Sequence, residues 1–200
     1  MTKFRNDTFT HILVGDVVQS QARLSGDDSQ FHRRDLIRAT FAAIEGLHWR
    51  LKQNVLNNSR RILSAHEYAA MMEESYSVNK RGEVESMPRF VPLTASIRLI
   101  VSVVKKYQPN YSVDFGHRGW SNLNHAIEVR NRLVHPKAMA DLTVLDCDIT
   151  KAISGFHWML ALVIEILEET KFSLEEYTKE TSKRREATLN RQSKKRAKRP

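Results

Sequence analysis

Leu93-Thr-Ala-Ser-Ile-Arg-Leu-Ile-Val-Ser-Val-Val-Lys-Lys-Tyr107 is the stretch that decides the fold class. Its apolar side chains recur every three or four residues and would line one face of an α-helix. Pro92 suits the first turn of a helix, and Pro109 cannot continue one. The spacing therefore predicts a helix over 93–107 with one side in a core. The residues of that side are Ile97, Ile100, Val101 and Val104.

The same periodicity predicts helices on both sides of this stretch. Only 7 Gly and 5 Pro interrupt the chain, which favours helices over a sheet. The turn Gly26-Asp-Asp-Ser29 and the capping-box pattern Ser64-Ala-His-Glu67 mark two helix starts. We expect a loop over 77–92 and an all-α fold, a four-to-six-helix up-and-down bundle. The other expected helices are a short one over 8–20 and longer ones over 31–56, 64–76, 120–134 and from Asp146 or Asp148 to Glu169.

The charge divides the chain into a body and a tail. Residues 179–200 hold ten Lys or Arg and two Glu, or 10 − 2 = +8, out of a formal charge of +9 for the chain. The body is thus nearly neutral, and 200 residues suit one domain. We expect a single helical domain over 1–178, with its core at about 92–169, and a basic tail over 179–200. The tail either attracts phosphate without sequence preference or only improves solubility.

Composition also indicates a compartment. The single cysteine, Cys147, cannot form an internal disulfide, which is typical of a reducing compartment. The amino terminus has no signal-peptide pattern. The longest apolar run, 159–164, ends at Glu165 and is far shorter than the roughly 20 residues of a membrane span. We therefore expect a cytoplasmic protein without a membrane partner.

One arginine lies where a helix would place it on an apolar face. In the helix over 120–134, Arg130 falls among apolar residues, and no carboxylate lies three or four residues away, whereas Arg132 has Glu128. A charge on such a face needs a partner from outside its helix. Asn131 and His135 follow on the adjacent polar side, and Pro136 ends the helix at His135. Arginine, asparagine and histidine thus converge at one helix end. The apolar residues are Leu123, Ala126, Ile127, Leu133 and Val134.

The stretch Arg130-Asn-Arg-Leu-Val-His135 resembles the R-N-x-x-x-H motif of the HEPN superfamily. The resemblance covers about 92–169. It implies a homodimer in which two copies of the motif, each with Arg130 and His135, face one cleft. A second copy of the spacing, Arg61 to His66, lacks the polar second residue and is interrupted by the capping signal at Ser64, so we treat it as a chance match.

The resemblance implies a metal-independent endoribonuclease with no cofactor. RNA supplies its own nucleophile, the 2′-hydroxyl, so His135 would transfer protons and Arg130 would grip the phosphate. Asn131 would orient His135, and Lys137 and Arg132 would bind flanking phosphates. The products would be 2′,3′-cyclic phosphate and 5′-hydroxyl ends. Cleavage of cellular RNA implies a toxin or anti-phage defence protein with a controlling partner such as an antitoxin.

Other interpretations of the same residues remain open. Arg130 could be a structural arginine paired with a carboxylate of another helix. The chain could also be a non-catalytic helical module that binds RNA or nucleotide, or an interaction bundle whose tail binds an acidic protein. Glu45 and His48 have the spacing of a di-metal ligand pair but lack the second pair that such sites need, so no metal is expected. His157 either packs or lines the cleft.

Overall fold

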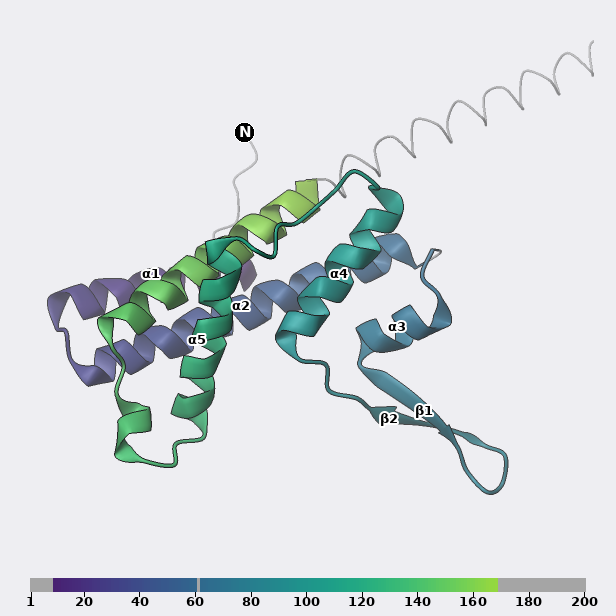
Figure 1. The fold of residues 1–200 in the computed structure, drawn as a ribbon, viewed down its shortest axis with the longest axis horizontal. Coiled ribbons are helices and arrows are strands. Elements are labelled where there is room, and N and C mark those ends of the chain that lie inside the picture. Colours follow the sequence, from purple (N-terminus) through teal and green to yellow (C-terminus); the bar gives the residue numbers. More distant parts are fainter. Residues whose placement is uncertain (1–8, 61, 169–200) are drawn as a thin grey trace, which may run out of the picture.

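The computed structural model of the chain describes residues 9–60 and 62–168 (Figure 1). The predictions that concern Arg61 and the basic tail lie outside these residues. The described part is mostly helical, as predicted, and also holds one two-stranded sheet. Its helices are α1 (Phe9–Gly26), α2 (Gln30–Ser59), α3 (Ala65–Met72), α4 (Leu93–Tyr107), α5 (Arg118–Val134), the 3-10 turn η1 (Met139–Leu142) and a last helix, Asp146–Glu168.

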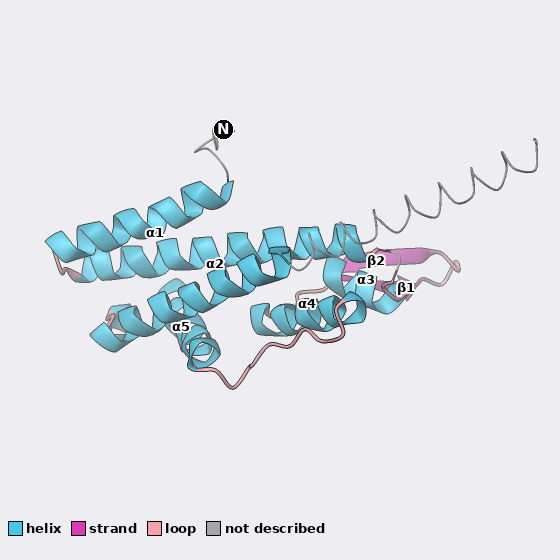
Figure 2. Ribbon diagram, turned by 90° about the horizontal axis from the view of Figure 1, so that it is seen from above, coloured by secondary structure: helices cyan, strands magenta, loops and turns pink. Residues whose placement is uncertain are grey.

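The long helix α2 is the element on which the others assemble. α1 runs back along it, joined by a short turn in which the Ser29 hydroxyl accepts a hydrogen bond from the backbone N–H of His32 at 3.4 Å. α4 and α5 also pack against α2 (Figures 1 and 2). The predicted helix 93–107 is thus confirmed. The predicted turn is shorter than expected and covers residues 27–29, because the first helix continues beyond residue 20 to Gly26.

The core lies where these helices meet. Most residues of the predicted apolar faces are buried, but Val134 of α5 is 52% exposed. α2 supplies more core residues than any other described helix, among them Leu36, Ile44 and Leu51. Gly155 lets the last helix approach α5, because a Cβ there would lie 2.7 Å from the Cα of Leu123. The buried residues of the other core helices include Ile97, Ile100, Val101, Val104, Leu123, Ala126, Leu133, Met159 and Ile166.

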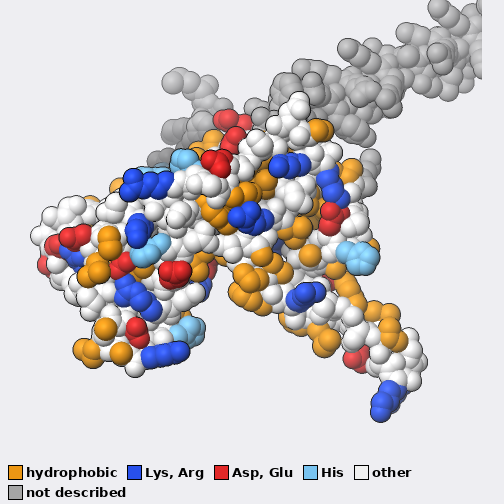
Figure 3. Space-filling view, in the orientation of Figure 1, with side chains coloured by type: hydrophobic (Ala, Val, Ile, Leu, Met, Phe, Trp, Pro, Cys, Tyr) orange, Lys and Arg blue, Asp and Glu red, His pale blue; other side chains and the backbone are white. Residues whose placement is uncertain are grey.

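The prediction for residues 64–92 is partly wrong. The capping box at Ser64 starts α3 as expected, but α3 ends at Met72 because Glu73 adopts a left-handed conformation (φ 58°). The expected loop is instead an antiparallel hairpin, β1 (Glu74–Val78) and β2 (Val84–Pro88). The side-chain oxygen of Asn79 accepts hydrogen bonds from the N–H groups of Arg81 and Glu83, which fixes the turn. The hairpin extends from the body (Figure 3).

The segment after α5, which contains η1, is held against α2 by arginines. Arg33 donates to the carbonyl of Val144 and Arg34 to the carbonyl of Leu142, each at 3.1 Å. The last helix then begins at Asp146, so Leu145 rather than Asp146 or Asp148 holds the N-cap position, and its carbonyl accepts the Ile149 N–H at 3.2 Å. The Asp146 carboxylate pairs with Arg33 at 2.5 Å. These contacts fix residues 135–145 against the start of α2.

By length and composition alone, the last helix could cross a membrane, and it is the one such helix in residues 9–60 and 62–168. A core helix of a soluble protein passes the same test. Ala152, Phe156, Met159 and Ile166 on one side of this helix are buried in the protein core.

Candidate functional site

The residues of the predicted motif lie on α5 or directly follow its end. The imidazole Nδ1 of His117 accepts a hydrogen bond from Gly119 N–H at 3.0 Å and caps the start of the helix. The helix ends where it was predicted to end: the N–H of His135 donates to the carbonyl of Asn131 at 3.0 Å, and Pro136 follows. The motif thus occupies the last turn of α5 and the residue just beyond it.

Arg130 has the outside partner that its position requires. Its Nη2 donates to the Glu45 carboxylate of α2, and its Nη1 donates to the side-chain oxygen of Asn131 at 3.1 Å. The guanidinium also lies 5.8 Å from the centre of the Phe41 ring. The Arg130 side chain is 34% exposed and that of Glu45 is 49% exposed, so the pair lies at the surface. The same pair is what the structural-arginine interpretation predicts.

His135 lies in the open, just past the end of α5. Its side chain is exposed, and its imidazole has no hydrogen-bond partner among the residues that the structure describes. Asn131 lies four residues earlier, and its carbonyl accepts the backbone N–H of His135 at 3.0 Å. Asn131 also accepts a hydrogen bond from Arg130 at 3.1 Å, so the guanidinium contacts both Asn131 and Glu45.

Arg132 points to a different set of partners from the one expected. Its Nη1 donates to the carbonyls of Asp141 and Thr143, and its Nη2 donates to Asp148 Oδ2 at 2.5 Å. The expected partner Glu128 is exposed and takes no part in this contact. Arg132 therefore fastens the 141–143 segment and the last helix to α5. This engagement leaves its predicted role in binding substrate without geometric support.

Asp148 is the buried centre of that contact. Its side chain is 5% exposed and also accepts from the Leu145 N–H at 3.0 Å and bonds His125 Nε2 at 2.8 Å. Burial by itself raises the pKa of the Asp148 carboxyl, but the Leu145 N–H, His125 and Arg132 together hold it below its ordinary value. We name Arg132, Asp148 and His125 the Asp148 network.

Lys137 follows His135 on the exposed segment. Its backbone N–H donates to Asp141 Oδ2 at 2.7 Å, and Ala138 N–H donates to the same oxygen at 2.9 Å. These two N–H groups lower the pKa of the Asp141 carboxyl. The Lys137 ammonium makes no ion pair within the described ranges, although its charge also helps to lower the pKa of Asp141.

Glu45 and His48 do not form a metal site. His48 is buried and bonds the Ser96 hydroxyl at 2.8 Å, while Glu45 faces Arg130. Burial, followed by the charge of Lys52, lowers the pKa of His48 to about 4. Within residues 9–60 and 62–168, no group of three potential ligands could hold a metal ion. Sequence reasoning missed Glu45 as a site residue because 85 positions separate it from Arg130.

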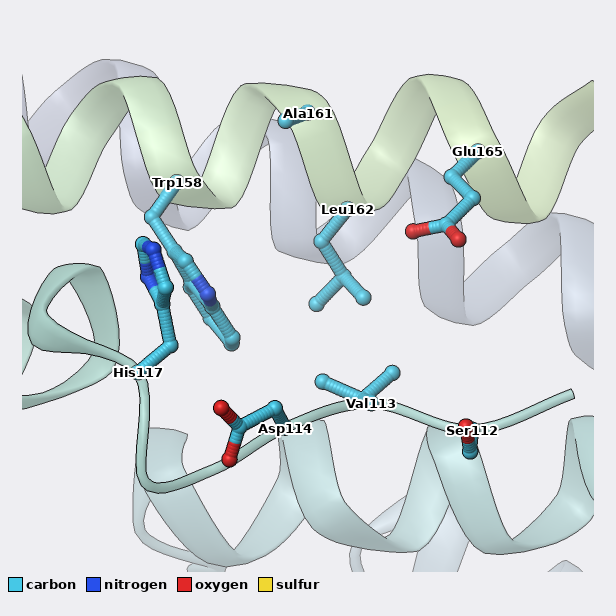
Figure 4. Close-up of a pocket in the computed structure, with 8 residues that line it drawn as sticks. All are labelled: Ser112, Val113, Asp114, His117, Trp158, Ala161, Leu162 and Glu165. Carbon is cyan, nitrogen blue, oxygen red and sulfur yellow. The ribbon is translucent and has the colours of Figure 1, made fainter.

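A shallow groove that the sequence did not predict lies at the opposite end of α5 (Figure 4). It encloses about 260 Å³ between residues 112–117 and the last helix. His117 and Trp158 lie side by side at one end, and the carboxylates of Asp114 and Glu165 border the cavity. His157 lines a neighbouring hollow with His117, away from the motif end of α5.

The motif residues therefore separate into two groups. Arg130 bonds Asn131 and Glu45, and His135 and Lys137 follow as exposed residues, while Arg132 belongs to the Asp148 network. Comparison of the chain with protein-family models, curated proteins and solved structures gives no match.

Proposed function

We propose that the chain is a metal-independent endoribonuclease that uses Arg130 and His135. The observation that carries the proposal is the exposed imidazole of His135, without an internal partner in the described part of the chain, four residues after Asn131, whose side-chain oxygen accepts a hydrogen bond from Arg130 at 3.1 Å. A histidine kept only for packing would be buried or bonded, as His48 is. The resemblance to HEPN ribonucleases supports the same residues.

The proposed reaction is a transesterification within the RNA. The 2′-oxygen attacks the adjacent phosphorus, and the bond from phosphorus to the 5′-oxygen breaks. One neutral imidazole takes the 2′-hydroxyl proton, and one protonated imidazole donates a proton to the departing 5′-oxygen. Two copies of His135 would supply both groups in a homodimer. Arg130 would stabilise the charge on the phosphate oxygens, and Lys137 would hold a flanking phosphate.

Glu45 has a defined place in this proposal. A phosphate and a carboxylate offer similar acceptor oxygens to a guanidinium, so bound RNA would compete with Glu45 for Nη2 of Arg130. Exposed ion pairs typically contribute less than about 1 kcal/mol, so the competition would cost little. Cleavage of cellular RNA would be harmful, and we propose a cytoplasmic toxin or defence effector that an antitoxin or similar partner controls.

The test is cleavage of RNA by the full chain in EDTA. We expect His135→Ala to lower the cleavage rate by about 10²- to 10⁴-fold, because it removes the proton-transfer group, and Arg130→Ala to lower it by a similar factor. His66→Ala is the matched control, because His66 is also exposed and belongs to the second copy of the spacing. Wild-type cleavage that survives His135→Ala would contradict the proposal.

The second candidate is a non-catalytic helical module, and the Glu45–Arg130 pair favours it. In that case the pair only joins α5 to α2, and RNA, a nucleotide or a protein is bound without cleavage. The same assay separates the candidates. Binding of labelled RNA without cleavage supports the module, whereas the absence of both binding and cleavage supports an interaction bundle.

A further inference from the structure

The hairpin has one apolar face that nothing in the described chain covers. Residues opposite one another in an antiparallel pair point to the same side, so Tyr76, Val78 and Val84 share a face. Tyr76 is 55% exposed, Val78 69% and Val84 70%. Phe90, just beyond β2, is 84% exposed. Figure 3 shows hydrophobic atoms along this arm and basic atoms at its tip.

The hairpin also has one free edge that can form a further strand pair. Asn79 N–H donates to the Glu83 carbonyl at 3.0 Å, and Arg89 N–H donates to the Glu73 carbonyl at 2.7 Å. Since bonded pairs alternate in an antiparallel ladder, the odd-numbered residues bond across the hairpin and the even-numbered ones point their backbone groups outward. On β1 these are Glu74, Tyr76 and Val78.

The two edges are not equivalent. On β2 the outward positions include Pro88, which has no N–H, and proline is a typical feature of a strand edge that stays unpaired. Every outward residue of β1 carries both a donor and an acceptor. An exposed edge of this kind is a template for pairing with another strand. An isolated two-stranded hairpin is only marginally stable, so additional strands would also stabilise it.

Charge identifies the strand that fits. The base of β1 carries Glu74, and the turn at its other end carries Lys80 and Arg81. When two copies of β1 run antiparallel, the basic turn of each lies beside the acidic base of the other. The Glu74 carboxylate accepts a hydrogen bond from the Tyr76 hydroxyl. This bond holds the Glu74 carboxylate on the apolar face, at the base of the hairpin. The edge is therefore complementary to itself.

We propose that β1 pairs with β1 of a second copy across a two-fold axis at Tyr76. The two hairpins then form one four-stranded sheet, in which Tyr76 faces Tyr76 of the second copy and Glu74 faces Val78. Such a contact is self-complementary, as two-fold interfaces must be. It uses the hairpin and not the motif end of α5, which lies across the molecule (Figure 1). The proposed strand pairing is therefore independent of whether the chain cleaves RNA.

The first experiment is disulfide trapping in the full chain. Cys147 is exposed, so every variant also carries Cys147→Ser. Two Cα atoms at an antiparallel self-pair lie about 5.5 Å apart, within the range of a disulfide. We expect Tyr76→Cys to give a cross-linked dimer under mild oxidation, several-fold more than Val84→Cys, the matched control on the other strand. Equal or absent cross-linking of the two variants would overturn the proposal.

The second experiment measures self-association without a cross-link. Sedimentation velocity over the micromolar range should show that Tyr76→Lys weakens association at least tenfold, because Tyr76 faces Tyr76 of the second copy and two lysines would meet at the new strand pair. Val18→Lys on α1 is the control, because Val18 is 58% exposed and lies outside the hairpin. Unchanged helical content by circular dichroism would show that both variants fold. A monomeric wild-type chain, or equal association of the two variants, would refute the strand pairing.

Discussion

Arg130 and Arg132 lie two positions apart on α5, yet they are placed in opposite ways. Arg132 donates to two carbonyls and to a carboxylate that is 5% exposed, and thereby joins three segments. Arg130 meets one carboxylate that is half in solvent, and the amide of its own neighbour. Burial strengthens the first set of contacts, and water weakens the second. The comparison separates an arginine that is paired with a buried carboxylate from one that is paired with an exposed carboxylate.

The largest expected effect in this comparison is the loss of Asp148. We expect Asp148→Ala to lower the free energy of unfolding by about 3 kcal/mol, because it removes the acceptor for Arg132, His125 and the Leu145 N–H together. Urea denaturation measures this change. Asp146→Ala is the control, because the Asp146 side chain is 90% exposed, and it should change stability far less. Equal losses would show that burial does not distinguish the two carboxylates.

The next effect extends the contrast to histidines, since His48 is buried and His135 is exposed. A folded pKa of about 4 for His48, below the unfolded value, means that the unfolded chain binds a proton first as the pH falls. Its stabilising contribution is complete above pH 6.5 and is lost toward pH 4, by up to about 3 kcal/mol. Denaturation at several pH values should show this loss, and His48→Gln should reduce it.

The smallest effect concerns the exposed pair. We expect Glu45→Ala to lower the free energy of unfolding by less than about 1 kcal/mol, since both side chains are well exposed. A double-mutant cycle with Arg130→Ala should give a coupling energy in the same range. A coupling of several kcal/mol would instead make Arg130 a structural residue like Arg132, and would count against its role in catalysis.

The sequence predicted those parts of the fold that depend on neighbours along the chain. The helix 93–107, the cap at Ser29 and the end of α5 all follow from local periodicity, caps and proline. The hairpin was missed because its strands are short and its apolar face is exposed to solvent. The opposite face of β1 carries Ser75 and Ser77, so the sequence shows no buried apolar pattern there. Tertiary contacts, which local patterns do not carry, decide such segments.

In the candidate site, too, the sequence predicted what depends on neighbouring residues and missed the contacts between distant ones. The need of Arg130 for a partner outside its helix could be read from the residues around it, but the identity of Glu45 could not, because it lies on α2. For Arg132 the local rule was misleading: Glu128 has suitable spacing, but the buried Asp148, 16 residues along the chain, takes the contact. A buried carboxylate gains more from a cation than an exposed one does.

The segment after His135 owes its path to arginines that bind its main chain. Arg33, Arg34 and Arg132 hold the carbonyls of Val144, Leu142 and Asp141, and carbonyls do not change when a side chain is replaced. Met139 and Ala140 are exposed and should accept a wide range of residues. This surface next to the histidine could therefore diversify in evolution while its backbone keeps one course.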